Sequence, residues 1–155
     1  MSCRFCLGLA RAPSHISFGR NHERPLFLGA KIGENLDRQA VLFGPPPLGP
    51  EAPPLQRLLA FGRERLRFAD VHRELLSEAN RDPDARYNAP FAVMHTHVRV
   101  LLEAAGSSGD LDAQSDALLA LLDADYVTRQ LTDRGLTLDA LGDAWESVAR
   151  KLCGK

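Results

Sequence analysis

Apolar side chains recur at helical spacing along much of the chain, most clearly over residues 138–152. There they fall at steps of three, four, three and four residues, which places them on one stripe of an α-helix. Thr137 can cap the start of this helix, and Asp139, Arg150 and Lys151 lie where their charges complement the helix dipole. Such a seam either completes the core of its own domain or docks against a second chain. Its members are Leu138, Leu141, Trp145, Val148 and Leu152.

Four further helical patterns precede this one. Their ranges are 54–79, 89–105, 110–122 and 126–133. The first carries two apolar stripes, which indicates burial on more than one side or one side that faces a cavity, and it can break near 70–72. Pro54 suits a first helical turn, Asp110 can cap the third pattern, and Gly135 can end the fourth. Because no strand-like alternation of useful length occurs, we predict an all-α fold.

Composition divides the chain at Gly44. Prolines are dense over residues 44–54, and since proline fixes φ and lacks a backbone donor, this segment is neither helix nor central strand. We expect a stiff, extended connector there. It separates an N-terminal segment, residues 1–43, from a main domain, residues 55–155. Within the N-terminal segment, residues 32–41 could form a short helix.

The bulk composition excludes several classes of protein. With 19 basic and 20 acidic residues in 155, the net charge is −1, so the whole chain is not an electrostatic binder of nucleic acid. No apolar run approaches the roughly 20 residues needed to span a bilayer. Three cysteines, an odd count, do not suggest a disulfide framework. We therefore expect a cytoplasmic protein with no membrane partner.

The order of several motifs points to a known family. They are GPPPLGP (44–50), LQRLLAFGRERL (55–66), HRELL (72–76), HTHVRVLL (95–102), DALLALLD (116–123) and RGLTLDAL (134–141), followed by Trp145. With these motifs in this order, residues 43–155 resemble the C-terminal effector-binding and dimerisation domain of TetR-family transcriptional regulators. The resemblance implies a homodimer whose last two long helices form a four-helix bundle with those of the partner, and a small-molecule pocket among the preceding helices. The interface residues it favours are Leu111, Ser115, Leu118, Leu138, Leu141, Trp145, Val148 and Leu152.

The N-terminal segment departs from this family. Its members begin with a three-helix DNA-binding head that contains a helix-turn-helix motif. Here residues 12–19 resemble a remnant of the recognition helix, with Ser14, His15 and Ser17 as its candidate DNA contacts. We expect a truncated or degenerate head, and operator DNA as a partner only if that head is functional. Weak DNA binding through Arg11, His15, Arg20 and Arg24 is an open alternative.

Candidate ligand-binding residues gather on the helices before the seam. Phe61, Arg65, Phe68 and His72 fall on neighbouring helical turns. This stripe is either part of the core or the wall of a cavity in which a cationic or imidazole side chain anchors a ligand. His95 and His97 are separated by about 200° around a helix, so they face different sides, and one of them could face a pocket. The candidates for binding a small, largely apolar effector are Phe61, Arg65, Phe68, His72, Tyr87, Phe91, Met94, His95, Val98 and Leu122, with plain core packing as the alternative.

Catalytic motifs are missing from the sequence. It contains no Gly-x-Ser-x-Gly, no His-Glu-x-x-His and no phosphate-binding loop, so we expect neither enzymatic activity nor a cofactor. Cys3 and Cys6 form a pair without the second pair that a zinc site needs. The leading hypothesis is a ligand-sensing and dimerisation module of the TetR type. The alternative is a small all-α metal-binding protein or enzyme that uses His72, His95 and His97.

Overall fold

The computed structural model describes residues 46–79 and 89–155, and within these ranges every element of regular secondary structure is a helix. The predicted all-α class is therefore confirmed. No helix of these ranges is both long enough and apolar enough to cross a membrane. The helices are α2 (Pro54–Val71), α3 (Arg73–Ala79), α4 (Ala89–Ala104), α5 (Leu111–Ala120), α6 (Ala124–Thr132) and α7 (Leu138–Leu152). The predictions for the N-terminal segment, including Ser14, His15 and Ser17, and that for Tyr87 lie outside the described residues.

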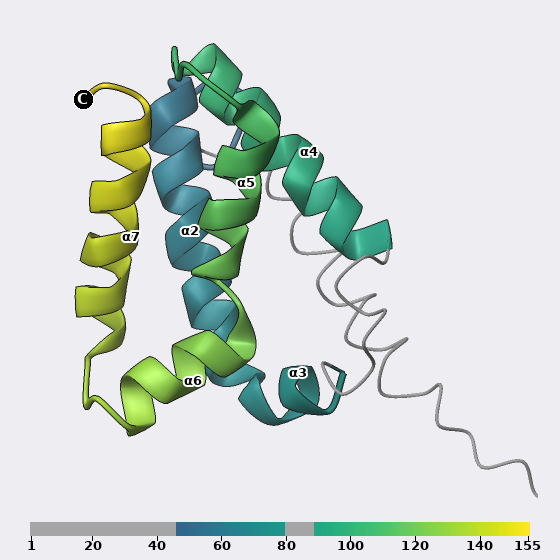
Figure 1. Ribbon diagram of the computed structural model, residues 1–155, viewed down its shortest axis with the longest axis vertical. Coiled ribbons are helices and arrows are strands. Elements are labelled where there is room, and N and C mark those ends of the chain that lie inside the picture. The colour runs from purple at the N-terminus through teal and green to yellow at the C-terminus, as the bar shows by residue number, and fades with distance from the viewer. Residues whose placement is uncertain (1–45, 80–88) are drawn as a thin grey trace, which may run out of the picture.

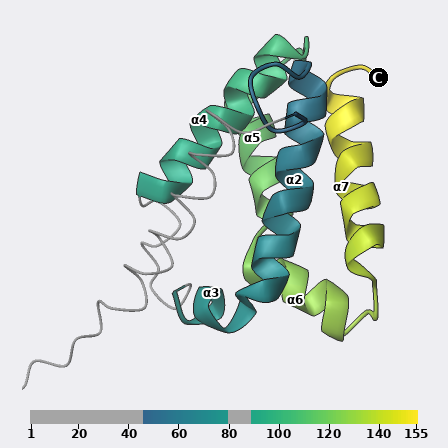
Figure 2. The same ribbon diagram turned by 180° about the vertical axis from the view of Figure 1, so that it is seen from behind.

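Helix α2 is the centre of the bundle. It packs against α7 on one side and α4 on the other, and α6 crosses near its C-terminal end (Figure 1). Helix α5 packs along α4 and also contacts α7, while the view from behind shows α2 and α7 side by side (Figure 2). The largest fully buried side chains lie where these helices meet: Leu58, Phe61, Leu66, Val98, Leu101, Leu102, Leu118 and Val127.

The helix ends follow local sequence signals. The Asp110 carboxylate accepts hydrogen bonds from the backbone N–H groups of Asp112 and Ala113, both at 3.0 Å, and the Thr137 hydroxyl accepts one from Ala140 at 3.1 Å. Both predicted caps are confirmed. Helix α6 begins at Ala124, two residues before the start that the apolar pattern indicated, because Asp123 caps it there.

The long helix predicted over 54–79 is interrupted within the expected 70–72 range. Helix α2 ends at Val71, the backbone N–H of His72 still bonds to the Phe68 carbonyl at 3.0 Å, and α3 then continues in a new direction (Figure 1). The predicted start at Pro54 is confirmed.

The proline-rich segment is not extended over its described part. Residues 46–52 form turns, with the Ala52 N–H donating to the Gly49 carbonyl at 3.3 Å. Leu48 packs against the core and Ala52 is 9% exposed. The expectation of an extended connector is wrong here, because proline also favours turns and the apolar side chains between the prolines gain by burial.

The contact between α2 and α7 is close because Gly62 has no side chain. The indole of Trp145 lies against Gly62 and is 2% exposed. Its Nε1–H donates to the backbone oxygen of Leu118 at 3.1 Å, which ties α7 to α5 as well. At the rim of this contact, the Arg63 guanidinium bonds to Glu146 and, at 2.7 Å, to Asp143. The seam of α7 thus packs onto α2 of its own chain.

This packing corrects the assignment of the seam. Ser115, Leu118, Leu141 and Trp145 are each at most 6% exposed in the single chain, so a second chain has no access to them while the fold is intact. They belong to the core of the chain. Leu111, Leu138 and Leu152 are partly buried against that core, and Val148 is 37% exposed. An interface formed by α5 and α7 would therefore need their outward faces.

Candidate ligand-binding site

The residues chosen from the sequence as pocket candidates divide into small groups. Arg65, Phe68 and His72 come together at the C-terminal end of α2: the rings of Phe68 and His72 are 4.6 Å apart, and Arg65 Cζ lies 4.7 Å from the centre of the Phe68 ring. On α4, the rings of Phe91 and His95 are 6.2 Å apart. Phe61, Phe68, Val98 and Leu122 are buried, whereas Arg65, His72, Phe91, Met94 and His95 are partly buried.

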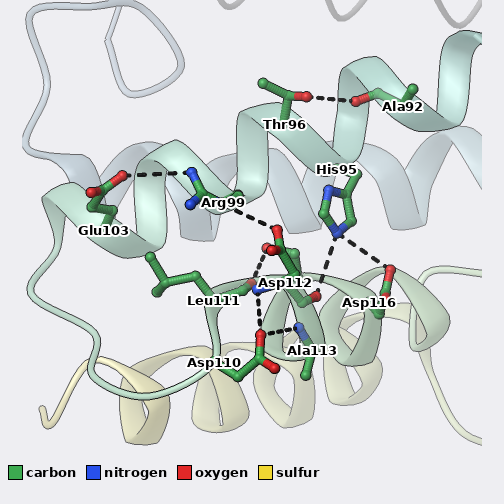
Figure 3. Close-up of polar contacts among 11 residues, drawn as sticks. Ala92, His95, Thr96, Arg99, Glu103, Asp110, Leu111, Asp112, Ala113 and Asp116 are labelled. Carbon is green, nitrogen blue, oxygen red and sulfur yellow. Dashed lines mark hydrogen bonds and ion pairs between the residues drawn. The ribbon is translucent and has the colours of Figure 1, made fainter.

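The two histidines of α4 face different neighbours, as predicted. His95 points toward α5, where its Nε2 lies 3.4 Å from the backbone oxygen of Asp112 and 3.4 Å from Asp116 Oδ1 (Figure 3). His97 points toward α2 and meets the Phe61 ring edge-on, with ring centres 5.2 Å apart and an interplanar angle of 63°. His97, rather than His95, is therefore the histidine that joins the aromatic surface of α2.

The polar contacts between α4 and α5 are structural. Arg99 Nε on α4 lies 3.0 Å from Asp112 Oδ1 on α5, while Arg99 Nη1 lies 3.8 Å from Glu103 Oε2 within α4 itself (Figure 3). The carboxylates of Asp112 and Glu103 are about two-thirds exposed, so solvent screens these two ion pairs, each of which contributes up to about 1 kcal/mol. We assign this group to the alignment of α4 on α5.

Arg57 was missed by the sequence analysis. Its Nε atom is buried and has no hydrogen-bond partner among the described residues. The first turn of α2 contains no acidic residue that could balance its charge. Arg63, by contrast, pairs with carboxylates through the equivalent Nε and one terminal nitrogen. One signal was available, because Arg57 precedes Phe61 by four residues and so extends the stripe of Phe61 and Arg65.

The electrostatic environment makes His97 neutral near pH 7. Burial, and secondly the charge of Arg57, lower the pKa of His97 from 6.5 to about 4. A neutral imidazole offers one N–H donor and one acceptor nitrogen. Arg57, Phe61 and His97 therefore offer a guanidinium whose buried Nε has no hydrogen-bond partner among the described residues, a neutral polar ring and an apolar aromatic surface.

The alternative based on three histidines has no support in the described geometry. Within residues 46–79 and 89–155, no group of three or more His, Cys, Asp or Glu side chains is arranged to hold a metal ion. His72 lies against Phe68, His95 against α5 and His97 against Phe61. Burial also raises the pKa of the Cys153 thiol, which disfavours the reactive thiolate.

Arg57, Phe61 and His97 form the candidate site, which we call the Arg57 cluster. The first two residues come from α2 and the third from α4, and these helices pack directly against each other. An arginine beside aromatic surface is typical of sites that bind an anionic group attached to an apolar body. Comparisons of the chain with protein-family models, with curated proteins and with solved structures gave no match.

Proposed function

We propose that the chain is the ligand-sensing and dimerisation module of a transcriptional regulator of the TetR type. In this proposal it binds a small, largely apolar effector at α2 and α4, and it associates with a second copy through the outward faces of α5 and α7. The order of the sequence motifs and the all-helical fold support this proposal, and the outward face of α7 carries it.

The outward face of α7 is lined by small side chains. Ala140, Ala144 and Ser147 are exposed there, while the apolar seam on the other side of the same helix is used within the chain. Helix α5, which contacts α7, exposes Ala113 and Ala117. Because the distance between packed helices depends on the side chains at their contact, small residues allow the helices of a second copy to approach closely.

The charges along α7 suit a symmetric partner. Asp139 and Asp143 lie in its N-terminal half and are exposed, whereas Arg150 and Lys151 lie in its C-terminal half and are also exposed. In a two-fold dimer, the same patch meets itself in the opposite direction. Two antiparallel copies of α7 that cross near Ala144 would therefore set the acidic half of each against the basic half of the other.

The test is the mass of the protein in solution, measured by light scattering. We expect the wild type to be a dimer and Ala144→Arg to be a folded monomer, because a long charged side chain blocks the close approach. Ala104→Arg, at an exposed position on α4, is the matched control and should stay dimeric. A substitution in the buried seam, such as Trp145→Asp, does not test this interface, since the Trp145 side chain is part of the core. A wild-type monomer, or a dimer insensitive to Ala144→Arg, would refute this interface.

Regulation of transcription requires a further part that this module does not supply. In an intact regulator of this type, effector binding would change the spacing of two DNA-binding heads and release the operator. Here the candidate head residues lie within 12–19, outside the described ranges. With a degenerate head, the module could still sequester effector or form mixed dimers with an intact relative. Co-expression with such a relative tests the second possibility, which fails if only separate homodimers are recovered.

A further inference from the structure

We propose that the N-terminal segment over residues 32–43 docks as a helix along the outward face of α4. The residues of this face, which we call the α4 stripe, are Val93, Thr96, Val100 and Ala104. The α4 stripe is separate from the outward faces of α5 and α7, so the inference does not rest on the proposed dimer. It names the occupant of an apolar surface that is exposed in the described part of the chain.

The α4 stripe is exposed although it carries no charge. Val93 and Val100 are each 51% exposed, and Thr96 and Ala104 are exposed as well. The four positions follow one another at steps of three, four and four residues, which places them on one side of the helix. Thr96 projects away from α5 (Figure 3), so the stripe lies on the side of α4 that this neighbour leaves open.

The composition of α4 indicates a helix that is covered on this side too. Apart from two histidines, Arg99 and Glu103 are its ionisable residues among 16 positions. Helix α7, whose outer side faces solvent in the single chain, instead carries five Asp, Glu, Arg and Lys residues among 15. A helix that is apolar on all sides is typical of one that is buried on all sides.

The described chain begins close to one end of the α4 stripe. Residues 46–53 lie at the end of the molecule where α2 begins and α4 ends, which both views show (Figures 1 and 2). Leu48 packs against the core and fixes this part of the chain there. Phe43 precedes Pro46 by three residues, and three residues span at most about 10 Å. The segment therefore approaches α4 from the end that carries Ala104.

The sequence of the segment predicts a helix with one apolar side. Its apolar residues recur at steps of four, four and three, and its charged residues fall on other sides of such a helix. The members of the apolar side are Ile32, Leu36, Ala40 and Phe43. A helix shorter than about 12–15 residues is marginal in water by itself, so this segment needs a surface to pack against.

The two apolar sides match in length and direction. Residues 32–43 and residues 93–104 are both twelve residues long, or about 18 Å as helices. Because the tether holds Phe43 near Ala104, the segment runs parallel to α4, with Leu36 against Val100. The attachment also makes docking intramolecular. Its high effective concentration favours this occupant over a second copy or another protein.

The test is urea unfolding of the full chain, read as the equilibrium constant of unfolding. We expect Val100→Ala to raise this constant about fivefold, because it removes apolar surface from a buried contact. With Leu36→Asp already present, Val100→Ala should change it less than about twofold, since the contact is lost. Val41→Asp is the matched control, because Val41 lies about 140° around the helix from Leu36. It should leave the effect of Val100→Ala intact.

A second measurement traps the contact without relying on stability. In a chain with Cys3→Ser and Cys6→Ser, mild oxidation should join Leu36→Cys to Val100→Cys in an intramolecular disulfide, detected by mass after alkylation of free thiols. Such a bond requires Cα atoms within about 7 Å of each other. Leu36→Cys with Val148→Cys is the control pair, because Val148 is exposed on α7, on the other side of α2 from α4. This pair should stay reduced.

Several results would overturn the docking. They are no loss of stability with Val100→Ala, a loss that survives Leu36→Asp, and equal oxidation of the two cysteine pairs. A surviving loss that depends on protein concentration would assign the α4 stripe to a second copy, and one that does not would assign it to another part of the chain. The mass measurement with Ala144→Arg concerns α5 and α7, so either proposal can fail while the other stands.

Discussion

Replacing Gly62 with alanine tests the packing that joins α2 to α7. At an exposed position inside a helix, Gly→Ala stabilises by about 1 kcal/mol, because alanine loses less conformational entropy on folding. Gly62 is instead covered by the indole of Trp145, and an added Cβ would lie within 2.6 Å of the indole Cη2. We therefore expect Gly62→Ala to destabilise the protein, against the helix propensity.

The magnitude follows from what must move. Overpacking a well-filled core costs about 1–3 kcal/mol. If the indole shifts to relieve the overlap, it also strains the bond from Trp145 Nε1 to the Leu118 oxygen, a bond whose net contribution is about 1 kcal/mol. Subtracting the gain of about 1 kcal/mol in helix propensity leaves a net loss of about 1–3 kcal/mol. Gly142→Ala is the matched control, because its Cβ would meet the flexible end of Arg63, with Nη1 at 2.7 Å.

The assay is urea unfolding followed by circular dichroism, with the free energy of unfolding obtained by linear extrapolation. We expect Gly142→Ala to lie within about 1 kcal/mol of the wild type, since the Arg63 end can move and its ion pairs are partly exposed. A double variant, Gly62→Ala with Trp145→Leu, should show an interaction energy that recovers part of the loss, because the two sites share one contact. Stabilisation by Gly62→Ala, or equal effects at Gly62 and Gly142, would refute the close packing described above.

Two further predictions concern a helix cap and a titration. Thr137→Ala should lower the free energy of unfolding by about 1 kcal/mol, because the hydroxyl no longer accepts the hydrogen bond from the Ala140 N–H. Thr96→Ala, within α4, is the control and should be nearly neutral or stabilising. Equal losses of stability in urea unfolding would contradict the capping role of Thr137. The pKa of His97 is about 4 in the folded chain and 6.5 in the unfolded chain, so between these pH values the unfolded chain binds one more proton. The free energy of unfolding therefore falls as the pH falls from 6.5 to 4, and His97 does not affect it above 6.5. At about 1.4 kcal/mol per pKa unit the loss approaches roughly 3 kcal/mol, and His97→Gln should flatten this part of the pH profile; an unchanged slope would rule out the neutral, buried histidine.

The sequence by itself determined the features that depend on neighbouring residues. The caps at Asp110 and Thr137 each involve atoms two or three residues apart, and the start of α2 at Pro54 depends on one proline. The apolar period also specified the helical class, because side chains three or four residues apart share one face of a helix. Helix α6 was placed too late along the chain, since its cap, Asp123, precedes a turn whose apolar pattern is weak.

The tertiary structure alone decided what covers each apolar face. The spacing over 138–152 is the same whether that stripe packs within its chain or against another, so the pattern could not choose between the two. Gly62 allows the stripe to pack within its own chain, because a position without a side chain on α2 admits the indole of Trp145. The same limit applies to Arg57. Its place on the stripe of Phe61 was visible in the sequence, but two features depend on contacts between residues distant along the chain: the lack of a hydrogen-bond partner for Arg57 Nε among the described residues, and the approach of His97 to Phe61 from α4. Periodicity specifies the direction in which a side chain points, whereas its neighbours are specified only when the helices pack.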